Sequence, residues 1–414
     1  MLKTAKRKHA AAFSVIALMV CLFAFCSSLI SYRVSISLFC VALFLMAALA
    51  IRSGRVLSFD LKALAPVLPW ILVACIAIIG FVIGNGYDLA ATVALISAVI
   101  FVVFATENSR WIRPTITVFI VVLLVFAITT IACYLFPTIY SGFIKPTFYA
   151  DVPMAQDYRS GLASHYSHNG TFCAVGLILS AALSLYDGGA PKAKRFNGLL
   201  ALAFLIALVL TTKRAHLLCG IFSIGAVYMS SGNQHKILKA IGFATLTILA
   251  VALLAPLVPG VEATVDRLTA TFSGSTSFED NVNNRTFLWN YAWEGFSQSP
   301  VFGHGWTSYC YRWPDGVTIT YMAHNELLNL LYETGLTGTA IALFGCFSSL
   351  FLTYRTIRKV SSINAKAYLR MSLCIQVFFL VLCIYKRSAF HDHTKSHLLF
   401  SFHCDYGKHQ VEYG

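Results

Sequence analysis

Long apolar runs dominate the hydrophobic pattern of this chain. A helix needs about 20 apolar residues to cross the ~30 Å hydrocarbon core of a bilayer. About eleven stretches approach this length and contain no Asp, Glu, Lys or Arg. They are residues 11–30, 34–51, 64–84, 89–105, 114–136, 170–186, 197–212, 215–230, 240–258, 336–353 and 371–385. We therefore predict an all-α polytopic membrane protein with about eleven transmembrane helices.

Two segments between the apolar runs are longer than ordinary connections. The first is residues 137–169, and the second is residues 259–335, which are rich in Trp, Tyr and Phe. Within the second segment, residues 284–297 and 325–332 have the pattern of short amphipathic helices at a membrane surface. We expect one long extracytoplasmic loop that contains these two helices.

This pattern divides the chain into four parts. Residues 1–258 are expected to form an N-terminal transmembrane bundle of about nine spans, followed by the long loop at 259–335. Residues 336–385 supply the last two spans. Residues 386–414 form a tail with five of the twelve histidines. We expect this tail to be a disordered or truncated end, with metal binding by the His-rich tract as the alternative.

The composition narrows the class of protein. Apolar residues make up 58% of the chain and charged residues 12%, with a formal net charge of +14. A soluble domain carries about 25% charged residues, and a disordered chain is poor in apolar ones. A nucleic-acid binder would account for the positive charge but not for the apolar content, so nucleic acid is not an expected partner. Lys and Arg gather in the cytoplasmic loops of membrane proteins, which accounts for both features.

The basic residues also predict an orientation. Lys3, Lys6, Arg7 and Lys8 precede the first apolar run, which has no small-residue cleavage site after it and is expected to be a retained anchor. With the N-terminus in the cytoplasm, most Lys and Arg fall on the cytoplasmic side. The long loop then lies outside, and over residues 259–325 it carries six acidic residues against three basic ones.

The most informative candidate for chemistry is a histidine at the end of the long loop. His324 stands at the head of an amphipathic pattern and shares one predicted helix face with Leu328 and Leu331. A histidine with a pKa near 6.5 can take a proton from a hydroxyl group. The alternative is a histidine that caps a helix or bonds a loop carbonyl. Likewise, Gly303-His304-Gly305 is either a plain turn or a turn whose N–H groups face an anion.

Basic residues on the predicted outer side form the second candidate. Arg159, Lys213, Arg214 and Arg285 oppose the positive-inside bias. Guanidinium groups bind phosphate with two hydrogen bonds, so an anion at the outer leaflet is one explanation. Snorkelling side chains at helix ends are the other. No Cys or His spacing indicates a zinc site, and no metal is expected.

These residues resemble the signature of the O-antigen ligase and O-antigen polymerase superfamily of bacterial membrane glycan transferases. The resemblance rests on His324-Asn325 with Glu333-x-Gly335-x-x-Gly338, and on a block that precedes it in the same loop. It covers roughly residues 155–355. The supporting segments are Arg285-x-x-x-Trp289, Pro300 to Gly305, Thr212-Lys213-Arg214-Ala215, Arg159-Ser160-Gly161 and His168-Asn169.

The resemblance implies an inverting glycosyltransferase of the bacterial inner membrane. Such enzymes move glycan from undecaprenyl pyrophosphate to a glycan or lipid-linked acceptor, without metal or other cofactor. His324 matches the essential histidine, and Glu333 matches the acidic residue of the signature. Arg214 and Arg285 match basic positions that hold the pyrophosphate, and Arg159 and Lys213 stand beside matching motifs. A base for the acceptor hydroxyl and fixed positive charge for the leaving pyrophosphate are what this reaction needs.

Other readings remain open. A polytopic transporter or flippase is the main alternative, although coupled transporters usually keep ionisable residues within their spans. A structural membrane protein is a third, and it would not need the His and Arg residues. The sequence does not separate a ligase of lipopolysaccharide biosynthesis from a polymerase of capsule or exopolysaccharide. Members of the superfamily usually have about twelve spans, so the predicted eleven is a departure.

Overall fold

The computed structural model is almost entirely helical over the residues it describes. These are 2–26, 29–30, 32–52, 67–82, 112–150, 157–230, 285–312, 320–321 and 323–385, with isolated residues between 92 and 100 and between 237 and 262. They fall into two compact units. Unit 1 lies within residues 1–29, 109–281 and 346–382, and unit 2 within 30–108, 282–345 and 383–414.

Helices coincide with nine of the predicted apolar runs. Five of them are long and apolar enough to cross a membrane. These five are α6 (Ile112–Leu135), α9 (Tyr166–Tyr186), α10 (Pro191–Leu210), α16 (Glu326–Lys359) and α17 (Ile363–Tyr385). Shorter apolar stretches lie in α1 (Leu2–Cys26), α2 (Tyr32–Arg52), α4 (Leu68–Val82) and α11 (Arg214–Met229). The runs at 89–105 and 240–258 lie largely outside the described residues, as does the tail, so the predicted total of eleven stays a prediction.

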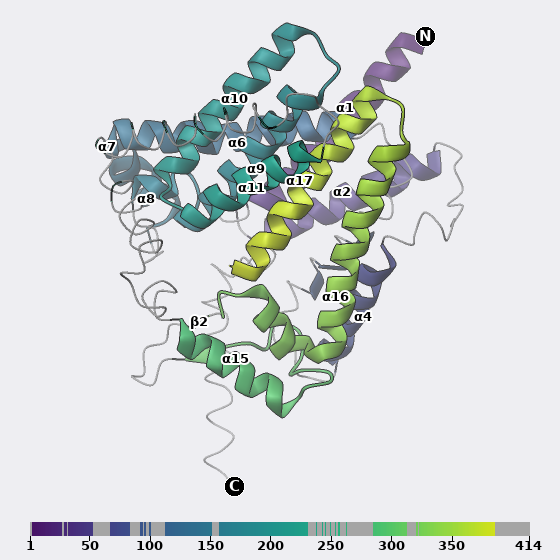
Figure 1. Ribbon diagram of the computed structural model, residues 1–414, viewed down its shortest axis with the longest axis vertical. Coiled ribbons are helices and arrows are strands. Elements are labelled where there is room, and N and C mark those ends of the chain that lie inside the picture. Colours follow the sequence, from purple (N-terminus) through teal and green to yellow (C-terminus); the bar gives the residue numbers. More distant parts are fainter. Residues whose placement is uncertain are drawn as a thin grey trace. The chain divides into compact units, whose positions relative to one another are not determined.

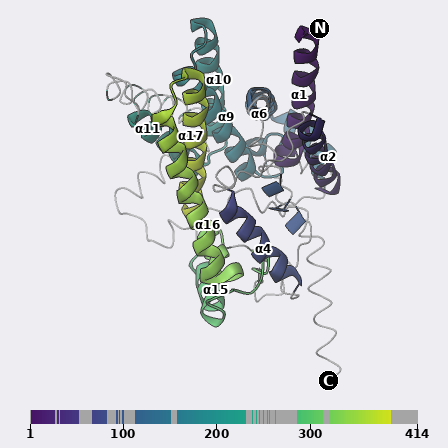
Figure 2. The same cartoon turned by 90° about the vertical axis from the view of Figure 1, so that its right-hand side faces the viewer.

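Unit 1 is built around α9, whose side chains are mostly buried. Helices α6, α10 and α11 pack against it, and α9 and α10 lie side by side (Figures 1 and 2). A Cβ at Gly176 of α9 would overlap the ring of Phe204 of α10, so glycine permits this close approach. Large apolar side chains on the outer face of α6, such as Val121 and Ile128, are more than half exposed. An apolar exterior of this kind suits lipid as the surrounding solvent.

Irregular helical turns close one end of unit 1. After α6 come α7 (Pro137–Ile139), the π-helical turn η2 (Tyr140–Ile144) and α8 (Lys145–Phe148), and the 3₁₀ turn η3 (Tyr158–Ser160) precedes α9. Buried Tyr140, Ile144 and Tyr149 pack with Cys133 of α6. The Tyr149 hydroxyl donates to the carbonyl of Leu162, 2.8 Å away. These contacts place η3 beside the first turn of α9.

The part of unit 2 that bears the sequence motifs contains α15 (Thr286–Gln298), a strand pair and the start of α16. Strand β1 (Tyr311–Arg312) pairs antiparallel with β2 (Thr320–Tyr321), with Tyr311 opposite Tyr321. Helices occur at both segments predicted to be helical, 284–297 and 325–332, whereas their place in an extracytoplasmic loop stays a prediction. The strand pair is an addition to the predicted all-α fold. Helix α4 also belongs to this unit: a Cβ at Gly345 of α16 would lie 3.0 Å from the Pro69 side chain.

Helix α16 is broken within its third turn. Gly335 has φ 61° and ψ −164°, which no helical residue adopts. A Cβ there would lie 2.5 Å from the backbone of Val301, and φ in this region already favours glycine. The break separates a short helix that carries the signature residues from the long apolar helix that follows.

Candidate functional site

The loop from Pro300 to Gly305 satisfies both ends of the break in α16. The N–H groups of Leu336 and Thr337 donate to the carbonyls of Pro300 and Val301, at 2.8 and 3.1 Å. In the opposite direction, the N–H groups of His304 and Gly305 donate to the carbonyls of Tyr332 and Glu333, at 2.9 and 2.8 Å. Helix ends leave such groups without partners, so these four bonds stabilise the break. We call this arrangement the clamp.

The clamp argues against an anion-binding turn at Gly303-His304-Gly305, one of the two interpretations of this motif. An anion-binding turn needs outward N–H groups, but those of His304 and Gly305 bond α16. The His304 ring lies 4.7 Å from that of Tyr332, and its Nε2 is 2.7 Å from the carbonyl oxygen of Gly295. A Cβ at Gly303, whose φ is +69°, would lie 2.5 Å from the backbone of Gly335. The motif therefore fastens α15 and the loop to α16.

His324 lies before the helix rather than on its face. Helix α16 begins at Glu326, and the Asn325 side chain accepts from the N–H groups of Leu327 and Leu328, at 3.1 and 3.2 Å. His324 itself has φ +53°. The predicted helix face shared by His324, Leu328 and Leu331 is thus wrong at its first member. Asn325 caps the helix, so the partly exposed His324 lies outside it.

Helix α15 positions the chain on the other side of His324. The indole N–H of Trp289 donates to the carbonyl of Ala323, 3.0 Å away. Arg285 is the N-cap residue of α15, one turn before Trp289. The spacing Arg285-x-x-x-Trp289 therefore has a structural explanation. Arg285 lies one helical turn before Trp289, and Trp289 holds the residue next to His324.

Glu333 is buried in the part of unit 2 that holds the clamp. Its side chain is 2% exposed and accepts from the N–H of Tyr309 at 3.4 Å. The Tyr309 hydroxyl donates to the carbonyl of Leu288 in α15, 2.9 Å away, and burial raises the pKa of this phenol. Glu333 thus ties the loop after Gly305 to α16, while Tyr309 ties it to α15.

A second group of the predicted residues meets in unit 1, around the ring of Tyr166. The Lys213 Nζ lies 3.8 Å from the ring centroid, and the Arg159 Cζ lies 5.1 Å from it. Asp157 forms an ion pair with Arg159 at 2.8 Å and accepts from its backbone N–H and its Nε. Hydrogen bonds to Asp157 raise the pKa of Arg159, so this guanidinium stays charged.

Asn169 explains why Arg159 lies here. Its side-chain amide donates to the carbonyl of Arg159 at 2.8 Å and to the Thr130 hydroxyl at 2.7 Å. Gly161 adopts φ +52°, and a Cβ there would lie 2.5 Å from the Thr130 hydroxyl oxygen. The predicted motifs Arg159-Ser160-Gly161 and His168-Asn169 therefore form one hydrogen-bonded unit with α6.

Arg214 begins α11 directly after Lys213. Both cations stand at the end of the helix where the macrodipole is positive, and no acidic residue occupies its first turn. Helix α9 also starts at this end of the unit, because Gly170 lies against the Lys213 side chain. Two helix N-termini and three cations make this an electropositive region. We call Arg159, Tyr166, Lys213 and Arg214 the cation group.

Backbone strain falls beside the predicted residues. Among the described residues, Thr212, Thr307 and His324 are the non-glycine positions with positive φ. Thr212 precedes Lys213, and Thr307 lies between the clamp and Tyr309. A side chain in this region costs about 1–3 kcal/mol and persists where the surrounding structure enforces it, often at functional sites.

The structure thus places the six predicted residues in two sets. Unit 2 holds Arg285, His324 and Glu333, and unit 1 holds Arg159, Lys213 and Arg214. Sequence reasoning missed Asp157 and Tyr166, and it named Asn325 in the signature without its role as the cap of α16. Asn325, directly before Glu326 and an apolar run, is a helix start signal that could have been read. Tyr166 has no such signal, because it meets Lys213 only through the fold.

Comparison with known families agrees with the motif-based resemblance. Residues 199–344 match the family model described as O-antigen ligase. The matched segment includes Arg214, Arg285, His324 and Glu333, whereas Arg159 precedes it. A search of curated proteins found no match. The match supports the resemblance over this segment, and five helices among the described residues have the length and composition of membrane spans, as in a multi-pass membrane protein.

Proposed function

We propose that the protein is an inverting, metal-independent glycosyltransferase, because residues 199–344 match the family model described as O-antigen ligase. It transfers oligo- or polysaccharide from undecaprenyl pyrophosphate to a hydroxyl of a glycan or lipid-linked acceptor. The bond between the anomeric carbon and the phosphate oxygen breaks, and a bond from that carbon to the acceptor oxygen forms. The acceptor proton goes to a base, and undecaprenyl pyrophosphate leaves.

His324 is the proposed base, and its backbone is the observation that carries this proposal. The left-handed conformation at φ +53° is enforced on both sides, by the Asn325 cap and by the bond from Trp289 to Ala323. A positive φ is uncommon for a residue other than glycine and often falls at functional sites, which supports a role for the His324 side chain. General base catalysis contributes typically 10²–10⁴-fold to a rate.

The cation group is the proposed partner of the pyrophosphate. Lys213 and Arg214 stand at a helix N-terminus, where their charges oppose the macrodipole unless an anion binds. Fixed positive charge near the low-dielectric bilayer stabilises the negative charge that grows on the leaving group. Arg159 is already paired with Asp157, so we assign it a supporting share of this role. Arg285 is proposed as a further phosphate contact.

Glu333 belongs to the proposed site through its position. Its buried side chain holds the backbone of Tyr309, so it acts on the loop that follows the clamp. We propose that it keeps α15, the loop and the start of α16 in one arrangement. In that role it is a positioning residue for His324.

The membrane assignment completes the proposal. The protein lies in the bacterial inner membrane with its N-terminus in the cytoplasm, and the loop that carries His324 faces outward. The donor is a lipid-linked glycan in the outer leaflet. Ligase and polymerase activities differ in the acceptor alone, and both release undecaprenyl pyrophosphate.

Surface glycan in a deletion strain tests the proposal. Plasmids supply wild type, His324→Ala, or the control Gln298→Ala at the exposed end of α15. We expect wild type and Q298A to restore the normal glycan length distribution, and H324A to insert into the membrane without restoring it. Normal glycan with H324A would contradict the proposal. Transport of lipid-linked glycan by proteoliposomes without release of undecaprenyl pyrophosphate would favour the transporter alternative.

A further inference from the structure

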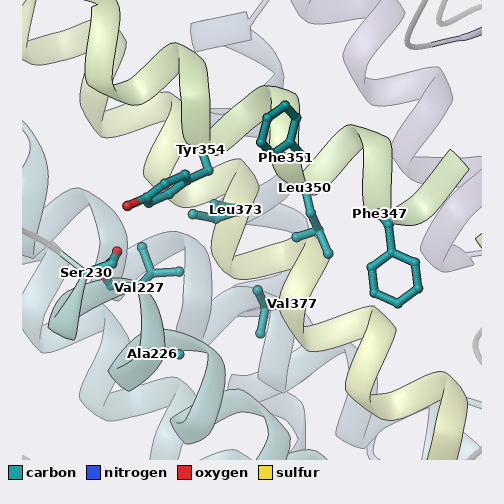
Figure 3. A pocket seen from close by; sticks show the side chains of 9 residues that line it. All are labelled: Ala226, Val227, Ser230, Phe347, Leu350, Phe351, Tyr354, Leu373 and Val377. Atoms are coloured by element: carbon teal, nitrogen blue, oxygen red, sulfur yellow. The ribbon is translucent and has the colours of Figure 1, made fainter. Parts of the chain in front are cut away.

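An apolar groove lies within unit 1, far along α11 from the cation group. It has a volume of about 390 Å³ and is lined by α11, α16 and α17 (Figure 3). The lining side chains are Ala226, Val227, Ser230, Phe347, Leu350, Phe351, Tyr354, Leu373 and Val377. Seven of these nine are purely hydrocarbon, and the volume falls within the range of about 300–1,000 Å³ that ligand pockets span.

The groove lies beside two helices that are hydrogen-bonded to each other, and it has an open side. The Gln376 side chain donates to the hydroxyls of Thr353 and Ser372, at 3.0 and 3.1 Å, and so links α16 to α17. Phe347 and Phe351 are 56% and 61% exposed, so the groove opens to the surroundings of the helix bundle. An apolar opening on a membrane-spanning helix faces lipid chains.

Hydroxyl groups and positive charge gather at one end of the groove. Tyr354 and Ser230 supply the hydroxyls, and in Figure 3 both lie toward the same side of it. Arg358 follows Tyr354 by four residues and Arg355 follows Phe351 by four, so each continues a lining stripe of α16.

Helix α17 adds charge at the same end. Lys366 and Arg370 precede the lining residue Leu373 by seven and three residues. The Arg370 guanidinium lies 4.8 Å from the ring centroid of Tyr186 at the end of α9. Among the described residues of unit 1, the acidic ones are Asp157, Asp187 and Glu262. Asp157 is in the ion pair beside the cation group, and Asp187 directly follows Tyr186 at the end of α9, where Arg370 lies. The basic residues of α16 and α17 still outnumber Asp187 at this end, so the net positive charge suits an anionic partner.

This end is distinct from the cation group. Helix α11 has 16 residues, and the cation group stands at its first residue whereas the groove contacts its last turn. At 1.5 Å per residue the two are roughly 20 Å apart along the helix. A pyrophosphate at Lys213 and Arg214 does not occupy the basic end of the groove.

We propose that this groove binds one acyl chain of an anionic glycerophospholipid. The phosphate-bearing headgroup lies against Arg355 and Arg358, near the Tyr354 hydroxyl, and the chain lies among Phe347, Leu350 and Val377. Basic pockets between membrane-spanning helices bind anionic headgroups in this way. The proposal does not depend on the glycan transfer proposed above.

Two pairs of variants separate the headgroup from the chain. Arg355→Gln/Arg358→Gln removes the headgroup contacts, and Arg113→Gln on α6, which does not line the groove, is its control. Ala226→Trp fills the groove from an exposed position on α11. Ala24→Trp, on an exposed position of α1, introduces the same side chain elsewhere in unit 1.

The experiment is native mass spectrometry of purified full-length protein titrated with dioleoylphosphatidylglycerol or dioleoylphosphatidylcholine. We expect wild type, R113Q and A24W to retain one phosphatidylglycerol in preference to phosphatidylcholine. The double variant should bind phosphatidylglycerol about 30-fold more weakly, since each basic residue near anionic lipid contributes about 1 kcal/mol. A226W should weaken both lipids about tenfold, the effect of displacing about two methylene groups.

Three results would overturn the proposal. Equal retention of both lipids by wild type removes the headgroup selectivity. Unchanged retention by A226W places the lipid outside the groove. Co-purification of a polyprenyl chain that only A226W abolishes assigns the groove to the donor's tail instead.

Discussion

His324 combines a reactive side chain with a strained backbone. Its φ of +53° lies in the left-handed region, which glycine adopts more readily than any residue with a Cβ. The residue is also partly exposed, between an Asn cap and a tryptophan-fixed carbonyl. The proposed chemistry requires an imidazole at this position, whereas the backbone conformation favours glycine. Substitutions can separate the two effects.

Replacing His324 by glycine or alanine separates them. Both variants lack the imidazole, so we expect neither to release undecaprenyl pyrophosphate. Glycine relieves the left-handed conformation, and the free energy of unfolding of H324G should exceed that of H324A by about 1 kcal/mol. Thermal unfolding in detergent gives the ranking. If H324A were the more stable variant, the positive φ of His324 would be absent in the protein. If H324G were active, His324 would not be the general base.

Tyr166 carries a second prediction at this scale. Two cations lie on its ring, and each contact contributes about 0.5–1 kcal/mol at such a site. Tyr166→Leu should raise KM for the lipid-linked donor about tenfold with kcat largely unchanged. Tyr166→Phe keeps the ring and should behave as wild type. Equal defects in Y166F and Y166L would assign the effect to the hydroxyl and contradict the cation–ring interaction.

At the scale of elements, the clamp is the feature that shapes the region around His324. It joins the loop from Pro300 to Gly305 to α16 through four backbone hydrogen bonds and needs glycine at two facing positions, Gly303 and Gly335. The segment before Gly335 can thereby take a different direction from the apolar helix after it. Backbone geometry thus accounts for Gly303 and Gly335.

Gly335→Ala tests the clamp. A Cβ there meets the Val301 backbone and the φ of +61° is strained, so we expect a loss of more than about 3 kcal/mol in stability. Gly225→Ala in α11 is the matched control, because nothing lies within 4 Å of its Cβ position. In that helix alanine should raise stability by about 0.5–1 kcal/mol. Similar melting temperatures for G335A and G225A would show that α16 is not broken as described.

At the scale of the whole molecule, the sequence predicted the helices well and their local interruptions poorly. The apolar runs at 114–136 and 170–186 became α6 and α9, because a run of that length has few alternatives to a membrane helix. A short helix at 325–332 and a separate span from 336 were predicted, but the left-handed conformation of Gly335 and its packing against the loop from Pro300 to Gly305 were not, because they depend on a contact with a distant segment.

In the candidate site, too, the residues were predicted better than the contacts between them. Asn169 and Arg159 were singled out together, and the Asn169 amide donates directly to the Arg159 carbonyl. Its second bond, to the hydroxyl of Thr130, reaches 39 residues back in the chain and was not predicted. The spacing of Leu328 and Leu331 extended the predicted helix back to His324. In the structure the helix begins after the Asn325 cap, and the positive φ of His324 excludes this residue from it. Contacts between distant residues, such as Lys213 on Tyr166, follow from packing and leave no local pattern.

Metal independence is a property of the whole reaction. Lys213 and Arg214 at the start of α11 supply the fixed charge proposed for the leaving pyrophosphate. Extensive dialysis of the purified protein against EDTA should therefore leave the release of undecaprenyl pyrophosphate within about twofold of the untreated rate, well inside one power of ten. A loss of more than tenfold that Mg²⁺ or Mn²⁺ restores would contradict the assignment of charge stabilisation to these side chains.

The most direct test is the release of undecaprenyl pyrophosphate by the purified protein from a lipid-linked repeat unit, compared between wild type and H324A. This product is common to ligase and polymerase activity, so the measurement does not require the acceptor to be identified beyond a cell-envelope extract. We expect wild type to form one undecaprenyl pyrophosphate for each glycan transferred, and H324A to be slower by about 10²–10⁴-fold while melting within a few degrees of wild type. Equal rates for the two proteins, or no release by wild type under conditions that support transfer in cells, would contradict the proposed function.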